Sequence, residues 1–193
     1  MRALFGRRHA YARLGKRQGL TTQPRLSDRL RALVDALPLH PGLRVLEIGG
    51  APGAAAKAVA RRIGDGHILV IDRSAKGVAL AEKNAAAEIA AGLLSVRQVA
   101  AEDFELLPNK PPFDLAFAIR VGALDGRHPA AGVRARQRIA AALTPTGRLI
   151  IDGDDPLRPV VVGDLPATEP HDAYAVAACH RTAERQDDRW SMC

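Results

Sequence analysis

Aromatic residues are scarce in this sequence of 193 residues: Phe, Tyr and Trp together make up 4% of it, whereas hydrophobic residues make up 47%. The core therefore has to be built from Ala, Leu, Val and Ile, and the length suits one globular domain. Near the N-terminus only Phe5 and Tyr11 lie among the basic residues. This is too little aromatic content to indicate a surface that stacks on nucleic-acid bases.

Long apolar runs are absent as well. No stretch of 18 apolar residues occurs, so we expect no transmembrane helix and no membrane partner. The N-terminus is basic but lacks the apolar region of a secretory signal. Neither the two cysteines, Cys179 and Cys193, nor the histidines have metal-binding or redox spacing. These features favour a cytoplasmic protein without a bound metal.

The positive charge of the chain is concentrated at its N-terminus. Nine of the 28 basic and one of the 21 acidic residues lie in residues 1–31, so this stretch carries +8 and the rest of the chain −1. We expect residues 1–25 to form a flexible basic arm and residues 26–193 to form a single domain. Such an arm can bind nucleic acid or an acidic substrate, or it can simply keep the protein soluble.

Beyond residue 26, short apolar segments alternate with segments of helical periodicity. Ser27 and Ser74 are the expected N-caps of the first and third helices. Alternating helices and strands predict a doubly wound, mostly parallel seven-stranded sheet with helices on both faces, a three-layer α/β/α sandwich. The expected helices are 28–37, 54–63, 75–92 and 129–143, and the expected strands are 43–49, 67–72, 94–100, 113–119, 148–152, 160–162 and 173–179.

The segment VLEIGGAPG places the carboxylate of Glu47 in an otherwise apolar strand, just before a glycine-rich turn. A buried carboxylate is costly unless a partner pairs with it, and a glycine-rich turn lets the main chain approach a ligand closely. A dinucleotide site would need Gly-x-Gly-x-x-Gly, but the frame here reads Gly49, Ala51 and Ala54. Glu47 would repel a pyrophosphate, whereas a cationic ligand would pair with it.

A second acid, Asp72, ends the next predicted strand, 23 residues after Gly49. This spacing is close to the roughly 20 residues expected for an acid that binds ribose hydroxyls. It indicates a nucleoside ligand but does not separate dinucleotides from other nucleoside cofactors. A capping role for Asp72 is less suitable, because Ser74 is nearer to the next helix.

Residues 47–53 resemble the first motif, E/D-x-G-x-G-x-G, of class I S-adenosylmethionine-dependent methyltransferases, with Ala51 in place of the middle glycine. The resemblance covers roughly residues 26–180. It implies a Rossmann-like fold and S-adenosyl-L-methionine as the cofactor. It also implies that Glu47 holds the ammonium group of the cofactor's methionine part, directly or through water.

The segment VAAEDF, after the third predicted strand, is similar to the family's adenine-contacting segment, which often reads G-D-A-E-D-L. Val99 and Ala100 stand where Gly and Asp are usual, whereas Ala101 and Glu102 match. Because residue 100 is alanine and not the usual aspartate, two interpretations stay open. The segment is either an adenine-contacting loop or an ordinary acidic loop.

Residues 119–128 follow the fourth predicted strand, and the resemblance implies that they border the transferred methyl group. They lack the D/N-P-P-Y/F signature of amino-group methylation and the aspartate and lysine pattern of ribose 2′-O-methyltransferases. Arg120 can bind an anionic substrate or pair with a neighbouring carboxylate. Asp125 and His128 are the nearest candidates for a general base, but a loop histidine is more often a surface residue, so we assign no catalytic residue.

Three functions stay open from the sequence. The favoured one is an S-adenosylmethionine-dependent methyltransferase acting on a small molecule. The others are an RNA or protein methyltransferase that uses the basic arm, and a catalytically degenerate domain that binds a nucleoside or a partner. A nicotinamide-dependent oxidoreductase is opposed by Glu47 and Pro52. The expected cofactor-binding residues are Glu47, Gly49, Gly50, Ala51, Gly53, Asp72, Arg73, Ala101, Glu102 and Arg120.

Overall fold

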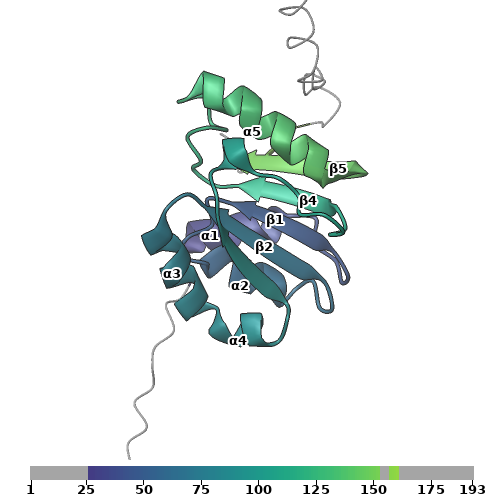
Figure 1. Ribbon diagram of the computed structural model, residues 1–193. Helices are drawn as coiled ribbons and strands as arrows, with labels where there is room; N and C mark the ends of the chain where they lie inside the picture. Colours follow the sequence, from purple (N-terminus) through teal and green to yellow (C-terminus); the bar gives the residue numbers. More distant parts are fainter. Residues whose placement is uncertain (1–25, 153–156, 161–193) are drawn as a thin grey trace, which may run out of the picture.

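The computed structural model describes residues 26–152 and 157–160. Its six strands form one sheet in the order β3-β2-β1-β4-β5-β6 (Figure 1). Neighbouring strands from β3 to β5 are parallel, and β6 is antiparallel to β5. The strands are β1 (Arg44–Ile48), β2 (His67–Asp72), β3 (Leu94–Gln98), β4 (Phe113–Ala118), β5 (Leu143–Asp152) and β6 (Leu157–Val160). The helices are α1 (Asp28–Ala36), α2 (Ala54–Ala60), α3 (Ala75–Asn84), α4 (Ala86–Ala90), the 3₁₀ turn η1 (Ala101–Asp103) and α5 (Pro129–Ala142).

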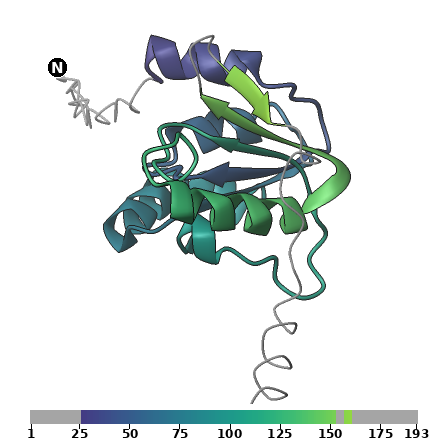
Figure 2. The ribbon, with the colours of Figure 1, turned by 90° about the horizontal axis from the view of Figure 1, so that it is seen from above.

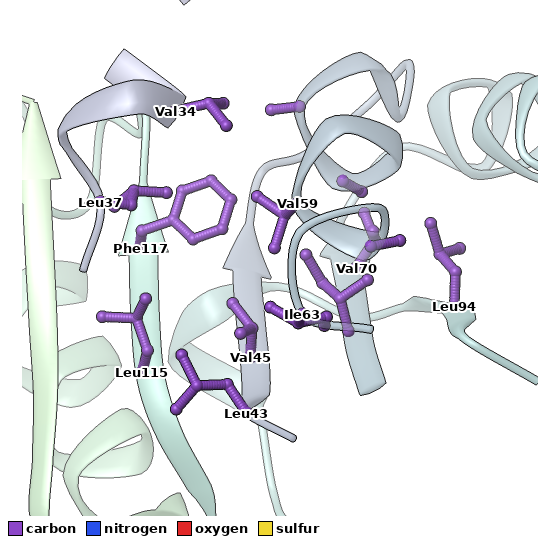
Figure 3. Packing of buried hydrophobic residues seen from close by; sticks show 14 of the residues in the cluster. Val34, Leu37, Leu43, Val45, Val59, Ile63, Val70, Leu94, Leu115 and Phe117 are labelled. Carbon is purple, nitrogen blue, oxygen red and sulfur yellow. The ribbon is translucent and has the colours of Figure 1, made fainter. Parts of the chain in front are cut away.

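Two clusters of buried side chains, one on each face of the sheet, form the core. On one face, α1 and α2 pack over the central strands through residues such as Val34 and Val59. Figure 3 shows Phe117 pointing from β4 toward Leu37 and Val59. On the other face, α5 packs over β4 and β5 through Ile139 and its neighbours. Figure 2 shows α1 and α5 on opposite sides of the sheet, as a doubly wound fold requires.

Strand β1 lies between β2 and β4 and is buried on both faces. Val45 belongs to the cluster covered by α1 and α2, whereas Leu46 and Ile48 belong to the cluster covered by α5. Because side chains alternate along a strand, Glu47 points to the same face as Val45. A strand buried on both faces is usually apolar throughout, so Glu47 is the exception in β1.

Several expected elements are confirmed. The strand expected at 67–72 is β2, and α5 begins with Pro129. Both serine caps form: the backbone N–H of Leu30 donates to Ser27 Oγ at 3.3 Å, and that of Gly77 donates to Ser74 Oγ at 3.1 Å. Each of these features depends on residues that are close together in the sequence.

The single long helix expected at 75–92 is wrong, because the chain forms two helices there, α3 and α4. Ala85, which joins them, is fully buried and has a non-helical φ of −107°. The carbonyl of Asn84 accepts a hydrogen bond from Lys57 Nζ of α2 at 2.6 Å. This contact gives the carbonyl a partner outside the helix, and no glycine or proline in the sequence marks the break.

Strand β5 begins at Leu143, five residues earlier than expected. Phe113 pairs with Leu143 and Leu115 pairs with Arg148, so β5 bulges between these two pairs. The Thr-Pro-Thr-Gly stretch, residues 144–147, is therefore part of the strand.

The strand expected at 160–162 overlaps β6 (Leu157–Val160) at Val160, and residues 161 and 162 lie outside the described residues. Only residues 153–156 separate β6 from β5. A crossover to a parallel strand needs a dozen or more residues, so this short link allows only an antiparallel neighbour.

The sheet has six strands within the described residues, so the expected count of seven is not confirmed. The strand expected at 173–179 and the basic arm expected at 1–25 lie outside the described residues. None of the helices described between residues 26 and 152 combines the length and the apolarity that a membrane crossing requires.

Gly132 generates a prediction about the packing of α5. A Cβ atom at Gly132 would lie 2.4 Å from the backbone oxygen of Ala123, which cannot move cheaply. Gly132→Ala should therefore lower the free energy of unfolding by about 1–2 kcal/mol, although alanine favours helix by about 1 kcal/mol. Urea denaturation measures this change. Val133→Ala, at the neighbouring exposed position, is the control and should leave stability unchanged or raised; a stabilised Gly132→Ala protein would contradict the close approach.

Candidate functional site

The turn of residues 49–53 lies at the carboxyl end of β1, between β2 and β4. The chain continues from β1 to β2 on one side, whereas β4 and β5 lie on the other side, so the strand order reverses here. Ligands of open parallel sheets bind in the crevice at such a point. Hydrogen bonds from Gly49 N to Ile71 O (2.8 Å) and from Gly53 N to Gly50 O (2.6 Å) fix the turn.

Two cavities lie beside this turn. Cavity one, of about 310 Å³, is lined by α1, the turn, the start of α2 and the residues after β4, and it includes Glu47. Cavity two, of about 540 Å³, is lined by the ends of β1, β2 and β3 and by residues of the 119–128 segment. Gly49 and Arg120 line both cavities. Both volumes fall within the range of about 300–1,000 Å³ that is usual for small-ligand sites.

Glu47 is 4% exposed and is the one buried charged side chain among the described residues. Its Oε2 atom is buried and has no hydrogen-bond partner among them. Burial raises the pKa of Glu47 to about 8; the negative charge of Asp72 adds to the rise, and the backbone N–H of Ala56 counteracts it. A carboxyl group in this state gains most from a cationic ligand that enters cavity one.

Gly50 and Gly49 make room for the side chains below and beside the turn. A Cβ atom at Gly50 would lie 2.5 Å from Glu47 Cδ and 2.8 Å from Val70 Cγ1. Gly49 has a φ of +68°, and a Cβ atom there would lie 2.8 Å from Val121 Cγ2. The absence of a side chain at Gly50 therefore lets the Glu47 carboxylate lie directly under the turn, and the absence of one at Gly49 leaves room for Val121.

Ala51 replaces the middle glycine of the motif, and the structure shows where its methyl group fits. A Cβ atom on Gly77, in the first turn of α3, would lie 2.8 Å from Ala51 Cβ. Gly77 therefore leaves the space that the Ala51 methyl group occupies. Sequence reasoning missed Gly77, because a glycine inside a helical segment gives no local sign of a contact with a turn 26 residues away.

Asp72 connects the end of β2 to the turn. Its Oδ1 accepts a hydrogen bond from Ser74 N at 2.8 Å, and its Oδ2 accepts one from Ala51 N at 3.3 Å. The carboxylate lines cavity two and is half-buried. Each oxygen keeps a further lone pair for a ligand, so these contacts position the acid without using up its capacity to bind.

The remaining expected residues lie around cavity two. Ala101, which is buried, and Glu102, which is half-buried, belong to η1, and η1 follows β3. Arg73, which is exposed, follows β2. All three line the cavity, together with Ala100. The structure thus brings together the ends of three strands, as the motif spacing predicts.

Arg120 occupies the border between the two cavities. It is exposed, and its backbone has a φ of +58°. Its N–H donates to Asp152 Oδ1 at 2.9 Å, and its carbonyl accepts from Arg127 Nη2 at 3.3 Å. Asp152 also pairs with Arg29 of α1 at 3.4 Å. Sequence reasoning missed Asp152, although its position at the end of a predicted strand, like that of Asp72, was a usable signal.

The two expected candidates for a general base differ in their surroundings. Asp125 binds Arg127, with 2.7 Å between Oδ2 and Nη2, and this contact lowers the pKa of Asp125. A low pKa makes Asp125 a poor proton acceptor near neutral pH. The ring of His128 lies against Gly122 and lines cavity two.

The pKa of Glu47 generates a prediction about stability. Between about pH 4.5 and 8 the folded protein keeps a proton that the unfolded chain releases, so the free energy of unfolding falls as pH rises through this range. The loss should amount to about 1.4 kcal/mol per pH unit, on the order of 5 kcal/mol in total. Urea denaturation between pH 5 and 8 should show Glu47→Gln gaining stability over the wild type as pH rises; parallel curves would contradict the shift.

Residues 45–147, more than half of the chain, match the family model of a methyltransferase domain. No curated protein matches the sequence at a significant level.

Three similar structures cover about two thirds of this chain or slightly less. The [4+2]-cyclase SpnF has 31% identity and a TM-score of 0.52, over 64% of this chain and 43% of its own. S-adenosylmethionine-dependent methyltransferases from Thiobacillus denitrificans and Geobacter sulfurreducens, both in complex with S-adenosyl-L-homocysteine, have 24% and 23% identity. Each has a TM-score of 0.51, over 65% of this chain and 47% of its own. The chain thus spans less than half the length of each of these three proteins.

The match covers the turn, the three cavity-lining acids Glu47, Asp72 and Glu102, and nearly all of the strands from β1 to β4, and the two methyltransferase structures share the parallel sheet. The chain therefore belongs to the methyltransferase-domain family, with the Rossmann-like fold of class I S-adenosylmethionine-dependent methyltransferases.

Proposed function

We propose that this protein binds S-adenosyl-L-methionine across the two cavities and transfers its methyl group to a small molecule. The observation that carries the proposal is the Glu47 carboxylate, which is buried, lines cavity one and has an oxygen without a partner among the described residues. The cofactor's methionine part carries an ammonium group, and such a group would pair with this oxygen.

The other residues around the turn fit the same ligand. We assign the ribose diol to Asp72, with Arg73 beside it, because the carboxylate is held in place at the edge of cavity two. Ala101 and Glu102 line the end of cavity two next to Asp72 and would border the adenine. Gly49, Gly50 and Ala51 supply the close main-chain wall, whereas Gly53 lies against Ala81 of α3 and lines neither cavity. Arg120 lies at the border of the two cavities, beside the space assigned to this ligand.

The cofactor donates a methyl group from its sulfonium. The neutral thioether that remains is a good leaving group, so its departure needs little catalysis. The protein's task is therefore to hold the acceptor in line with the methyl group and to keep it oriented. The part of cavity two lined by residues of the 119–128 segment is where an acceptor would lie. A cavity of small-ligand size supports a small-molecule acceptor over a macromolecule.

Binding and methyl transfer are separate parts of the proposal. A similar structure of 31% identity is a [4+2]-cyclase, and a shared fold can host different reactions. Binding of the cofactor and of its product is accordingly the first quantity to measure.

The binding test uses calorimetric titration with S-adenosyl-L-homocysteine, which keeps the methionine ammonium group. The wild type should bind it, and Glu47→Gln should weaken binding about 30-fold or more, since losing one partner of a buried charge pair costs about 2 kcal/mol or more. Asp72→Asn should weaken it as well. Glu82→Gln, at an exposed position of α3, is the matched control and should bind like the wild type.

NAD serves as the competing ligand in the same titration, and it should not bind, because Glu47 would repel its pyrophosphate. The affinity of the wild type for S-adenosyl-L-homocysteine should rise from pH 6 to about 8, since Glu47 must lose its proton to pair with an ammonium group. Equal binding by wild type and Glu47→Gln at pH 8 would overturn the assignment of Glu47.

The Ala51 and Gly77 pair generates a second binding prediction. Gly77→Ala should push the turn away from α3, because the two methyl carbons would lie about 2.8 Å apart, and binding and stability should both fall. We expect a stability loss of about 1–3 kcal/mol from such overpacking. Adding Ala51→Gly to Gly77→Ala should restore most of both quantities. A double variant as impaired as Gly77→Ala alone would show that the contact between the two methyl groups is not the cause.

A further inference from the structure

Arg120 adopts a backbone conformation that an arginine rarely occupies. Its φ of +58° is left-handed, and among the described residues the other non-glycine with a positive φ is Asn109. Asparagine tolerates this conformation and glycine adopts it freely, whereas a long side chain pays a free-energy cost. Local backbone strain of this kind is concentrated at functional sites. The backbone conformation therefore does not explain why residue 120 is an arginine, and the explanation has to come from its side chain.

The conformation of Arg120 is fixed from both sides of the residue. Asp152 Oδ1 accepts from its N–H at 2.9 Å, and Arg127 Nη2 donates to its carbonyl at 3.3 Å. The Asp152 side chain is only 9% exposed and also pairs with Arg29 of α1. The strands and α1 thus hold the Cα–Cβ direction of Arg120 in a single orientation.

The guanidinium group of Arg120 has no such anchor. It makes no hydrogen bond or ion pair with any residue described between 26 and 152, although Arg120 lines both cavities. The neighbouring Arg127 differs, because its guanidinium is paired with Asp125. Asp152, the other acid nearby, is occupied by the Arg120 N–H and by Arg29. An exposed arginine that is held in place but unpaired is available to bind an anion.

The wall of cavity two around Arg120 carries positive charge and no negative charge. From the 119–128 segment, the lining side chains that can carry charge are Arg120, Arg127 and His128. The acid of this segment, Asp125, binds Arg127 and is not part of the lining. The acids of cavity two, Asp72 and Glu102, lie at the ends of β2 and β3, on the side that we assign to the cofactor's nucleoside.

We propose that Arg120 binds a carboxylate or phosphate group of the methyl acceptor, so that the acceptor is an acidic small molecule. The inference rests on the proposed function, because it places the acceptor beside a bound cofactor. Carboxylates and phosphates both match the planar guanidinium with two parallel hydrogen bonds. An anionic group held at Arg120 orients the acceptor through a part of the molecule that does not react.

The experiment separates the acceptor from the cofactor, since the cofactor also carries a carboxylate. The ¹⁵N-labelled protein is titrated with inorganic phosphate and with succinate, with and without saturating S-adenosyl-L-homocysteine. The arginine Nε–Hε signals report the contact, and the signal of Arg120 is identified by its loss in Arg120→Gly. The anions should still bind when S-adenosyl-L-homocysteine is present and should shift the Arg120 signal.

Arg120→Gly is the decisive variant, because glycine suits the left-handed backbone. It should be at least as stable as the wild type in thermal unfolding and should bind the anions at least 10-fold more weakly. Arg120→Asn, which also tolerates this conformation, should behave in the same way, and Arg120→Lys should retain part of the affinity. Arg134→Ala, an exposed arginine of α5, is the matched control and should bind like the wild type.

The outcomes that overturn the inference are distinct from those that overturn the proposed function. Unchanged anion binding in Arg120→Gly, or displacement of the anions by S-adenosyl-L-homocysteine, would overturn the inference and leave the proposed function intact. A response to single-stranded RNA, without one to phosphate or succinate, would overturn the assignment to a small molecule. Failure of the folded wild type to bind S-adenosyl-L-homocysteine would overturn the proposed function and this inference together.

Discussion

The burial of one carboxylate constrains the whole site. Glu47 occupies a core position of β1, on the face covered by α1 and α2, where an apolar residue would be the stable choice. Its side chain fits there only because Gly50 above it has no Cβ atom. Burial raises the pKa to about 8, so the folded protein keeps this carboxyl group protonated at neutral pH, and a cationic ligand would favour its charged form. Burying the acid costs the folded protein some stability. Such a cost is typical of binding sites and not of cores.

The elements around this carboxylate hold the turn in one conformation. Asp72 binds the N–H of Ala51, and Asn84 Nδ2 donates to the carbonyl of Pro52 at 3.1 Å. Gly77 of α3 leaves the space for the Ala51 methyl group. Strand β2 and helix α3 therefore reach the turn from one side, while α1 and the residues after β4 reach it from the other. The wall of the candidate site is thus held in place by the protein's own contacts, and a preformed wall lowers the entropic cost of binding a ligand.

Sequence patterns predicted the parts of the site that depend on neighbouring residues. Glu47, the glycine turn and Asp72 lie within two strand–turn–helix units, so their spacing carries the information. Asp152 was missed because its contact with Arg120 joins the ends of β4 and β5, 32 residues apart, and follows from the strand order. The break at Ala85 was missed for a similar reason, since Lys57 of another helix supplies the contact there. Tertiary contacts of this kind leave no periodic trace in the sequence.

The residues of the first motif and the residues after β4 have different roles in the proposed function. In the proposed function, Glu47, the turn and Asp72 select the cofactor, and a fold built around such residues can host more than one reaction, as the cyclase among the similar structures illustrates. Under the same proposal, the residues after β4 determine what can be placed beside that cofactor. In this chain the carboxylate of Asp125 forms an ion pair with Arg127. The backbone of Arg120 is held by Asp152, whereas its guanidinium group has no partner among the described residues. In the proposed methyl transfer, a sulfonium donor requires positioning more than proton removal, so a residue that fixes the acceptor would contribute more than a base.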